Sequence, residues 1–252
     1  MCGIGGVFQH DSARPIDPAV LIAMAAIQSH RGPDGCGWKT INDRGVGFTH
    51  ARLAIIDLNA DRARQPFVSD NPQIMIAHNG EFYDYKRIRA DLTSRGYRFN
   101  TKSDTELLMH LTDRFGLEGA MTHLRGEFGF AVHEKKYDRL TLVRDRFGIK
   151  PLFWTMTPEG VVFGSEIKVL FSHPAVKRKI SPHGLYHQLM QFARAIWHTE
   201  RSIHNTFTIS KMLLSEHVQK AGYRVVLTGE GSDELFAGYP QLRLDIAILN
   251  DM

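Results

Sequence analysis

The second residue of the chain is a cysteine, and Gly3 and Gly5 follow it in the opening stretch MCGIGGVF. Thiolate chemistry needs a nearby base, and an N-terminal α-amine, with a reference pKa of about 7.7–8.0, accepts a proton near neutral pH. Removal of Met1 places the thiol and the amine on one residue, Cys2, which is the arrangement of an N-terminal nucleophile. The competing interpretation is a buried cysteine at the start of a strand.

Residues far along the chain offer groups that complement such a nucleophile. Asn79 carries an amide and Gly80 an unscreened backbone N–H, and a developing oxyanion needs such donors. An ordinary Asn-Gly turn is the alternative for this pair. Arg52 lies among apolar residues in HARLAIIDL, where a substrate carboxylate would pair with its guanidinium, and Asp104 in KSDTELL offers the opposite charge to a substrate amine. A structural ion pair is the alternative for both.

The elements that must position these residues follow from hydrophobic periodicity and capping signals. A short buried strand is predicted over 3–9, and the stretches VGFTHARLAIID and QIMIAHNG are β-rich, the second being broken by Asn79-Gly80. Two hairpins are predicted in EFGFAVHEKKYDRLTLVRD and PLFWTMTPEGVVFGSEI, and the aromatic residues of EFGF and PLFW are expected in the core.

Helices are expected between these strands. The first is DPAVLIAMAAIQSH with Asp17 as its N-cap, and the others lie near 84–95 and near 103–115, where Ser103 and Glu106 form a capping-box pattern. Strands bracketed by helices indicate a layered α+β domain that closes near residue 178. Beyond it, helices are predicted at SPHGLYHQLMQF and TISKMLLSEHVQKAG, and a strand at YRVVLTG.

Composition narrows the class of protein. The 252 residues are 43% hydrophobic and 23% charged, which is ordinary for a globular protein with a sizeable core. The net charge of +4 is scattered, so nucleic-acid binding is not expected, and no window is apolar enough to span a membrane. Two cysteines without a pairing pattern, and an N-terminus unlike a signal peptide, indicate a cytoplasmic protein in which Cys36 is a structural thiol.

Eight motifs in order resemble one known family. They are MCGIGGVF, HRGPDG, HARLAIIDL, NGEFYDY, SDTELLM, LRGEFGFAV, RDRFGIKPLF and FGSEIKVL. Together they resemble the class II glutamine amidotransferase domain of glutamine-hydrolysing asparagine synthetases, over residues 2–178. The resemblance implies a four-layer αββα sandwich of the N-terminal-nucleophile type. It also implies hydrolysis of L-glutamine to glutamate and ammonia through a thioester, a step that uses no cofactor.

The resemblance also assigns roles to individual residues. Cys2 would be the nucleophile and, through its amine, the base, while Asn79 and Gly80 match the oxyanion-hole positions. The positions that bind glutamine are Arg52 for its α-carboxylate, Glu81 and Asp104 for its α-amine, and Ile55 and Ile56 through their backbone. His50 and His78 flank the site, although a histidine on a strand is more often a core residue.

The C-terminal segment 179–252 resembles part of the ATP-dependent synthetase domain of the same family. Glu230 matches a catalytic acid/base position, and Asp233 and Glu234 match residues near the Mg²⁺–pyrophosphate, so ATP and Mg²⁺ are the cofactors expected for that step. However, the ATP loop of the form Ser-Gly-Gly-x-Asp-Ser does not occur in the sequence. The match to the family pattern is interrupted near residues 192–193. The 74 residues of this segment are few for a nucleotide-binding domain. This short α/β remnant therefore argues against ATP-dependent amidation by the chain alone.

Several alternatives stay open at this point. The chain is a shortened relative, a rearranged gene product, or a sequence that omits an internal segment. The expected partners are L-glutamine, an acceptor such as aspartate or another carboxylate, and a second copy of the chain or a separate synthetase subunit. The alternative function is a non-catalytic or regulatory remnant that binds glutamine or a partner.

Overall fold

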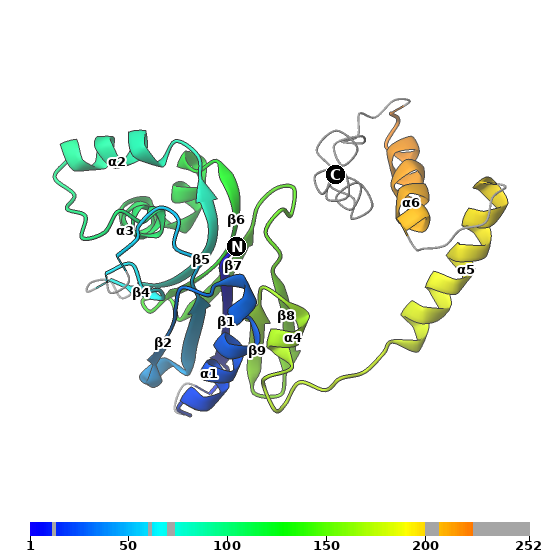
Figure 1. Cartoon of the computed structure of the whole chain (residues 1–252), viewed down its shortest axis with the longest axis horizontal. Coiled ribbons are helices and arrows are strands. Elements are labelled where there is room, and N and C mark those ends of the chain that lie inside the picture. Colours follow the sequence, from blue (N-terminus) through cyan, green and yellow to red (C-terminus); the bar gives the residue numbers. More distant parts are fainter. Residues whose placement is uncertain (12–13, 60–61, 70–73, 200–206, 224–252) are drawn as a thin grey trace, which may run out of the picture. The chain divides into compact units, whose positions relative to one another are not determined.

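The computed structural model describes residues 1–11, 14–59, 62–69, 74–199 and 207–223 (Figure 1). The chain divides into two compact units, Met1–Arg178 and Lys179–Met252. The first unit contains every residue of the predicted glutamine site.

Two antiparallel sheets form the centre of the first unit. The five-stranded sheet has the order β2 (Cys36–Ile41), β3 (Val46–Ala51), β1 (Gly3–Gln9), β9 (Gly160–Gly164) and β8 (Phe153–Thr157). The four-stranded sheet has the order β4 (Phe67–Val68), β5 (Ile74–Phe82), β6 (Gly126–Glu134) and β7 (Arg139–Arg144). The first strand of the chain therefore lies in the middle of its sheet, between β3 and β9.

Helices cover the outer face of each sheet. The five-stranded sheet is covered by α1 (Pro18–Ile27) and α4 (Ile167–Leu170), and the four-stranded sheet by α2 (Tyr85–Ser94) and α3 (Asp104–His123) (Figure 1). Two short 3-10 helices, η1 (Ser29–Arg31) and η2 (Asn42–Arg44), lie on either side of β2. The layers follow the order α, β, β, α, which confirms the predicted sandwich.

Three apolar clusters correspond to the three interfaces between these four layers. One cluster lies between the sheets and includes Ile4, Phe48 and Met75. A second packs the four-stranded sheet against α2 and α3, and a third packs the five-stranded sheet against α1 and α4. Alternate residues of β5 belong to different clusters, because successive side chains of a strand point to opposite faces.

Both predicted N-caps are confirmed, whereas the predicted capping box does not form. Asp17 accepts a hydrogen bond from Ala19 N at 2.9 Å, and Ser103 accepts one from Thr105 N at 3.2 Å, so both residues cap their helices. Glu106 does not complete a capping box on Ser103. Its carboxylate instead accepts from the backbone N–H groups of Asn100 and Thr101, each at 2.7 Å, and thereby holds the loop that enters α3.

Three sequence predictions are wrong. Asn79-Gly80 does not break the strand, because β5 continues through both residues, paired with β6, to Phe82. The aromatic residues of β8 are exposed rather than in the core, Phe153 by 37% and Trp154 by 61%, because β8 is an edge strand. Cys36 is an exposed thiol on the edge strand β2, which the sequence patterns did not indicate.

The second unit contains two described helices, α5 (Pro182–Thr199) and α6 (Phe207–Lys220). They pack on each other, and Arg194 Nη1 lies 3.1 Å from Glu216 Oε2. The helix predicted at 181–192 continues to Thr199 without interruption at 192–193. The predicted strand after Tyr223 lies outside the described residues. Within the described part of the chain, no helix is long and apolar enough to cross a membrane.

Candidate active site

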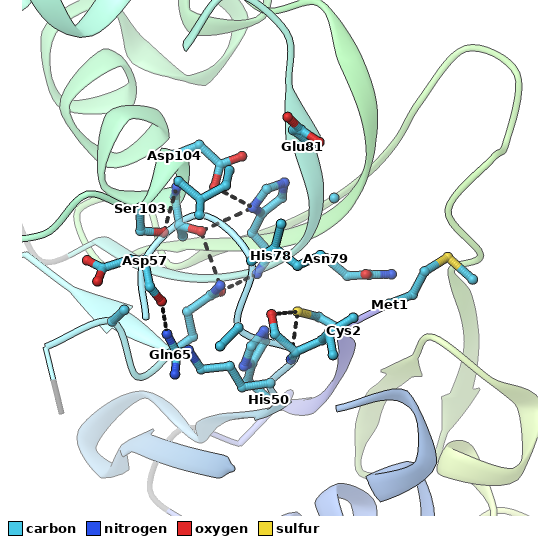
Figure 2. Close-up of a pocket in the computed structure, with 18 of the residues that line it drawn as sticks. Met1, Cys2, His50, Asp57, Gln65, His78, Asn79, Glu81, Ser103 and Asp104 are labelled. Carbon is cyan, nitrogen blue, oxygen red and sulfur yellow. Dashed lines mark hydrogen bonds and ion pairs between the residues drawn. The ribbon is translucent and has the colours of Figure 1, made fainter. Parts of the chain in front are cut away.

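Four of the candidate residues meet at one end of the sandwich because of strand alternation. The space between the sheets is lined by even-numbered residues of β1 and β3 and by odd-numbered residues of β5. At one end of the sandwich, the same alternation directs four side chains toward this space, those of Cys2, His50, Arg52 and Asn79. All four line a single pocket, shown in Figure 2.

The Cys2 thiol lies against the backbone of the loop that follows β3. Its Sγ is 3.3 Å from Leu53 N and 3.5 Å from Leu53 O. Burial raises the pKa of this thiol, whereas the Leu53 N–H and the positive charges of the N-terminus and Arg52 act in the opposite direction. Because burial dominates, the thiol stays protonated near neutral pH and needs a base before it can attack a substrate.

An ion pair holds the backbone of Cys2. Arg31 Nε donates to Cys2 O at 2.9 Å, and Arg31 Nη1 donates to Glu166 Oε1 at 3.2 Å. Glu166 also contacts Lys168 and His30, and hydrogen bonds from these side chains and Arg31 hold its pKa at about 2 despite the opposing effect of burial. Arg31 of the HRGPDG motif thus fixes the entry into β1, a role that the sequence did not reveal.

Asn79 and Gly80 lie at adjacent positions of β5. Asn79 is 1% exposed, and its Nδ2 has no hydrogen-bond partner among the described residues. Gly80 is required for close packing, because a Cβ atom at this position would lie only 2.2 Å from the backbone oxygen of Glu127 on β6. The site therefore has a buried amide donor beside a backbone that no side chain screens.

Arg52 lines the same pocket. It follows β3, is buried, and donates from Nη2 to the backbone oxygen of Asp57. Within the described part of the chain no carboxylate pairs with this guanidinium, so it is available to a ligand anion. The loop that closes on Arg52 also brings Ile55 and Ile56 to the pocket, and Asp57 anchors it through Lys102 N at 2.7 Å.

Asp104 and Glu81 contribute negative charge to the same pocket. Asp104 begins α3, is 4% exposed, and accepts a hydrogen bond from Phe82 N at 3.1 Å. Burial raises the pKa of its carboxyl to about 6. Glu81 is exposed on β5, opposite Glu127, whose carboxylate is neutralised by Lys150 at 2.7 Å.

Both histidines that flank the site are buried and line the pocket. Burial lowers the pKa of His50 to about 3 and that of His78 to about 3, so both rings are neutral at physiological pH. His50 lies between the sheets, whereas His78 is on the helix-facing side of β5, where it stacks on Phe82. Gln65 and Thr105, which also line the pocket, were not singled out in the sequence, because no short-range pattern marks them.

The candidate residues of the second unit are not placed. Glu230, Asp233 and Glu234 lie outside the described residues. In the ranges that the structure describes, no group of three or more His, Cys, Asp or Glu side chains could hold a metal ion.

The chain is similar to known proteins over more than two thirds of its length. Residues 1–223 match the family model described as a glutamine amidotransferase domain. The chain is 39% identical over 183 residues to glutamine-hydrolysing asparagine synthetase 2 of Bacillus subtilis (strain 168), an alignment that covers 72% of this chain and 24% of that protein. It is 42% identical over 172 residues to asparagine synthetase 1 of the same organism, covering 68% of this chain and 26% of that protein. The chain thus spans about a quarter of the length of these relatives.

A solved structure shows the same fold. Glutamine phosphoribosylpyrophosphate amidotransferase from B. subtilis, complexed with ADP and GMP, superposes with a TM-score of 0.56 at 20% sequence identity. The match covers 68% of this chain and 43% of that chain. At this level of identity the likeness concerns the arrangement of layers and strands.

Proposed function

The chain belongs to the glutamine amidotransferase domain family, and we therefore propose that it hydrolyses L-glutamine to glutamate and ammonia through a thioester on Cys2. The observation that carries the proposal is that a nucleophile, an oxyanion donor, a cation and an anion line one pocket. These groups are Cys2, Asn79, Arg52 and Asp104. A free α-amino acid with a reactive side-chain amide presents the complementary set of charges.

In this proposal each charged group of glutamine meets a side chain of opposite charge. Arg52 binds the α-carboxylate, and Asp104 together with Glu81 binds the α-ammonium. The backbone of Ile55 and Ile56 lies along the substrate. These contacts direct the side-chain amide of glutamine toward the sulfur of Cys2.

The chemistry then proceeds on protein groups. After removal of Met1, the α-amine of Cys2 accepts the thiol proton, and the sulfur adds to the side-chain carbonyl carbon of glutamine. Asn79 Nδ2 and the Gly80 N–H donate to the resulting oxyanion. The C–N bond breaks as the amine returns the proton to the leaving nitrogen, and ammonia departs. Water then hydrolyses the thioester to glutamate, so no cofactor or metal is needed for this step.

Glutamate release by the purified chain tests this proposal. The Cys2→Ala variant is expected to lower the rate by at least about a thousandfold, since it removes the nucleophile and leaves the pocket intact. Cys36→Ala is the matched control, because Cys36 is exposed on β2, and it should keep the full rate. Glutamate release that does not depend on Cys2 would contradict the proposal.

The rival function, a non-catalytic remnant that binds glutamine or a partner, requires either that Met1 is retained or that the C-terminal segment blocks the pocket. N-terminal sequencing tests the first condition, because an uncleaved Met1 leaves no free amine on Cys2, and glutamate release by the purified chain tests the second. The reducing environment that such a thiol needs, together with two free cysteines, favours the cytoplasm as the compartment.

We further propose that the ammonia serves the ATP-dependent amidation of aspartate or another carboxylate, and that these 252 residues do not carry out that step by themselves. The support is the absence of the Ser-Gly-Gly-x-Asp-Ser motif from the 252 residues. The chain alone, given ATP, Mg²⁺, aspartate and ammonia, is therefore expected to form no AMP and no pyrophosphate. Formation of both products by the chain would show that it carries its own nucleotide site.

A further inference from the structure

Asp57 uses both its backbone and its side chain to join two parts of the candidate pocket. Its backbone oxygen accepts a hydrogen bond from Arg52 Nη2 (Figure 2). Its carboxylate accepts from Lys102 N at 2.7 Å through Oδ2 and from Asn59 N at 2.9 Å through Oδ1. Lys102 comes shortly before Asp104 in the sequence. Asp57 therefore connects the loop that follows the proposed carboxylate-binding group to the segment that precedes the proposed ammonium-binding group.

The segment on the far side of this connection, residues 100–103, is fixed by two helices. Glu106 on α3 accepts from two backbone N–H groups of the segment, each at 2.7 Å. Arg89 on α2 donates to two of its backbone oxygens, also at 2.7 Å each. Because its backbone is bonded to both helices, the segment is a fixed reference for whatever bonds to it.

The loop on the near side is held by hydrogen bonds more than by burial. In its described part, residues 53–59, Ile55 is 69% exposed and Leu58 is 77% exposed. The start of this loop is bonded to the HRGPDG segment, and the carboxylate of Asp57 supplies the bond to the fixed segment 100–103. A loop with few buried apolar side chains opens locally at low cost when such a bond is lost. Loss of this bond would therefore also release the backbone oxygen that holds Arg52.

The two carboxylate bonds of Asp57 can be separated by substitution. Burial acts to raise the pKa of this carboxyl, but the N–H groups of Lys102 and Asn59 and the charge of Arg52 lower it overall, so both oxygens are acceptors at neutral pH. A serine at this position keeps an oxygen for the local bond to Asn59 N, as serine does in turns. Its side chain is one atom shorter, so we expect it to lose the bond to Lys102 N.

The separation between Arg52 and Asp104 matters for a ligand that carries both charges. A free α-amino acid has its carboxylate and its ammonium on one carbon atom, so the two protein groups must meet them at one fixed separation. Any freedom between the two groups is lost when such a ligand binds, and this loss lowers the affinity. A ligand with only one of the two charges does not require that separation.

We propose that Asp57 is a positioning residue of the glutamine site, which holds Arg52 and Asp104 at the separation that an α-amino acid requires. This inference rests on the proposed function for the identity of the substrate and of the two groups that bind it. The link between the loop and α3 does not depend on that function and can be measured without a ligand.

The first test measures hydrogen exchange of the Lys102 amide by NMR in the ligand-free full-length chain. We expect this amide to be protected in the parent protein and to exchange at least about tenfold faster in Asp57→Ser and in Asp57→Ala. Asp17→Ser is the matched control, because Asp17 also accepts from an N–H two residues on, that of Ala19, but at the start of α1. It should leave the exchange at Lys102 unchanged.

The second test separates KM from kcat for glutamine. In Asp57→Ser, KM should rise by about tenfold while kcat changes by less than about threefold, because the nucleophile and the oxyanion donors are placed by β1 and β5. Asp17→Ser should change neither constant.

The third test compares ligands that carry one or both charges, by NMR titration of Cys2→Ala with and without Asp57→Ser. L-Glutamine carries both charges, glutaramic acid lacks the α-amine, and 4-aminobutanamide lacks the α-carboxylate. Asp57→Ser should weaken the binding of glutamine by about tenfold and that of each single-charge analogue by less than about threefold. Equal weakening of all three ligands would mean that the substitution merely damages the pocket, and it would overturn the inference.

The remaining outcomes separate this inference from the proposed function. Absence of glutamate release by a parent protein whose Cys2→Ala variant binds glutamine overturns only the glutaminase proposal, and the titrations still decide the role of Asp57. A Lys102 amide that exchanges freely in the parent protein overturns the inference. So does an Asp57→Ser variant with unchanged KM, or an Asp17→Ser variant whose KM rises as much. Should Asp57→Ala fail to fold, Asp57→Ser gives the answer by itself.

Discussion

At the scale of single residues, burial opposes the charged forms that the proposed chemistry requires. The pocket raises the pKa of the Cys2 thiol and raises the pKa of Asp104 to about 6. A buried thiol is unreactive until a base removes its proton, and the α-amine on the same residue is the nearest base that the proposed mechanism supplies. A buried carboxylate, in turn, gains most from a ligand that brings a compensating positive charge.

The pKa of Asp104 makes glutamine binding depend on pH. Because the ammonium group binds the ionised carboxylate, and because the folded-state pKa is about 6, affinity is fully present above pH 6 and is lost below it. Calorimetry on Cys2→Ala, which binds without turnover, should show the Kd rising by about tenfold for each pH unit below that value.

Asp104→Asn provides the control for this prediction. The amide oxygen can still accept from Phe82 N, so the loop and α3 keep their positions, but no charge is present to titrate. Binding by the double variant Cys2→Ala/Asp104→Asn should be weak and independent of pH between 5 and 8. A pH dependence that persists in this variant would assign the titration to another group.

At the scale of secondary-structure elements, the pairing of β5 with β6 presents the oxyanion donors. Gly80 lies opposite Phe128 in this register, with Glu127 O in the space that a side chain would occupy. Gly80→Ala is therefore expected to lower the free energy of unfolding by about 1–3 kcal/mol and to reduce kcat, because the strands must separate locally at Asn79.

Gly129→Ala tests the same sheet without the steric conflict. A Cβ atom at Gly129 would have its nearest neighbour, Pro151 O, at 3.5 Å, an ordinary contact, and this glycine is the strand partner of Asn79. Denaturant unfolding of both variants should show little change for Gly129→Ala. Equal destabilisation of the two would mean that any alanine in this sheet is harmful and that Gly80 has no special role.

At the scale of the whole molecule, the first unit contains all that the proposed reaction needs. Its three apolar clusters and every residue that lines the pocket precede residue 179. A chain ending at Arg178 is therefore expected to fold cooperatively and to hydrolyse glutamine with a kcat within about twofold of the full chain. Thermal unfolding and glutamate release measure both properties. Loss of either one would show that residues 179–252 support the glutaminase site.

The family match extends past the first unit, to residue 223, and includes α5 and α6. In the described part of the second unit these helices expose large apolar side chains, among them Tyr186, Leu189 and Trp197. The remaining candidate residues, from Glu230 onward, lie outside the described residues, so their proposed connection with ATP and Mg²⁺ stays a prediction.

The sequence by itself determined the elements and the chemistry that are encoded by neighbouring residues. Helix caps at Asp17 and Ser103, and the two hairpins, depend on groups a few residues apart, so short-range patterns predict them. The types of the candidate residues, a cysteine, an amide, an arginine and an aspartate, also suggested an acyl-transfer site before their positions were known.

Only the tertiary structure decided how distant segments constrain one another. It placed Asn79-Gly80 in an extended strand, because pairing with β6 overrides the turn preference of that dipeptide. It placed Trp154 on an exposed edge, since strand order is not encoded in hydrophobicity alone. It also brought Gln65 between His78 and Thr105, because a buried N–H must find an acceptor and the chain supplies that acceptor from a loop 13 residues away.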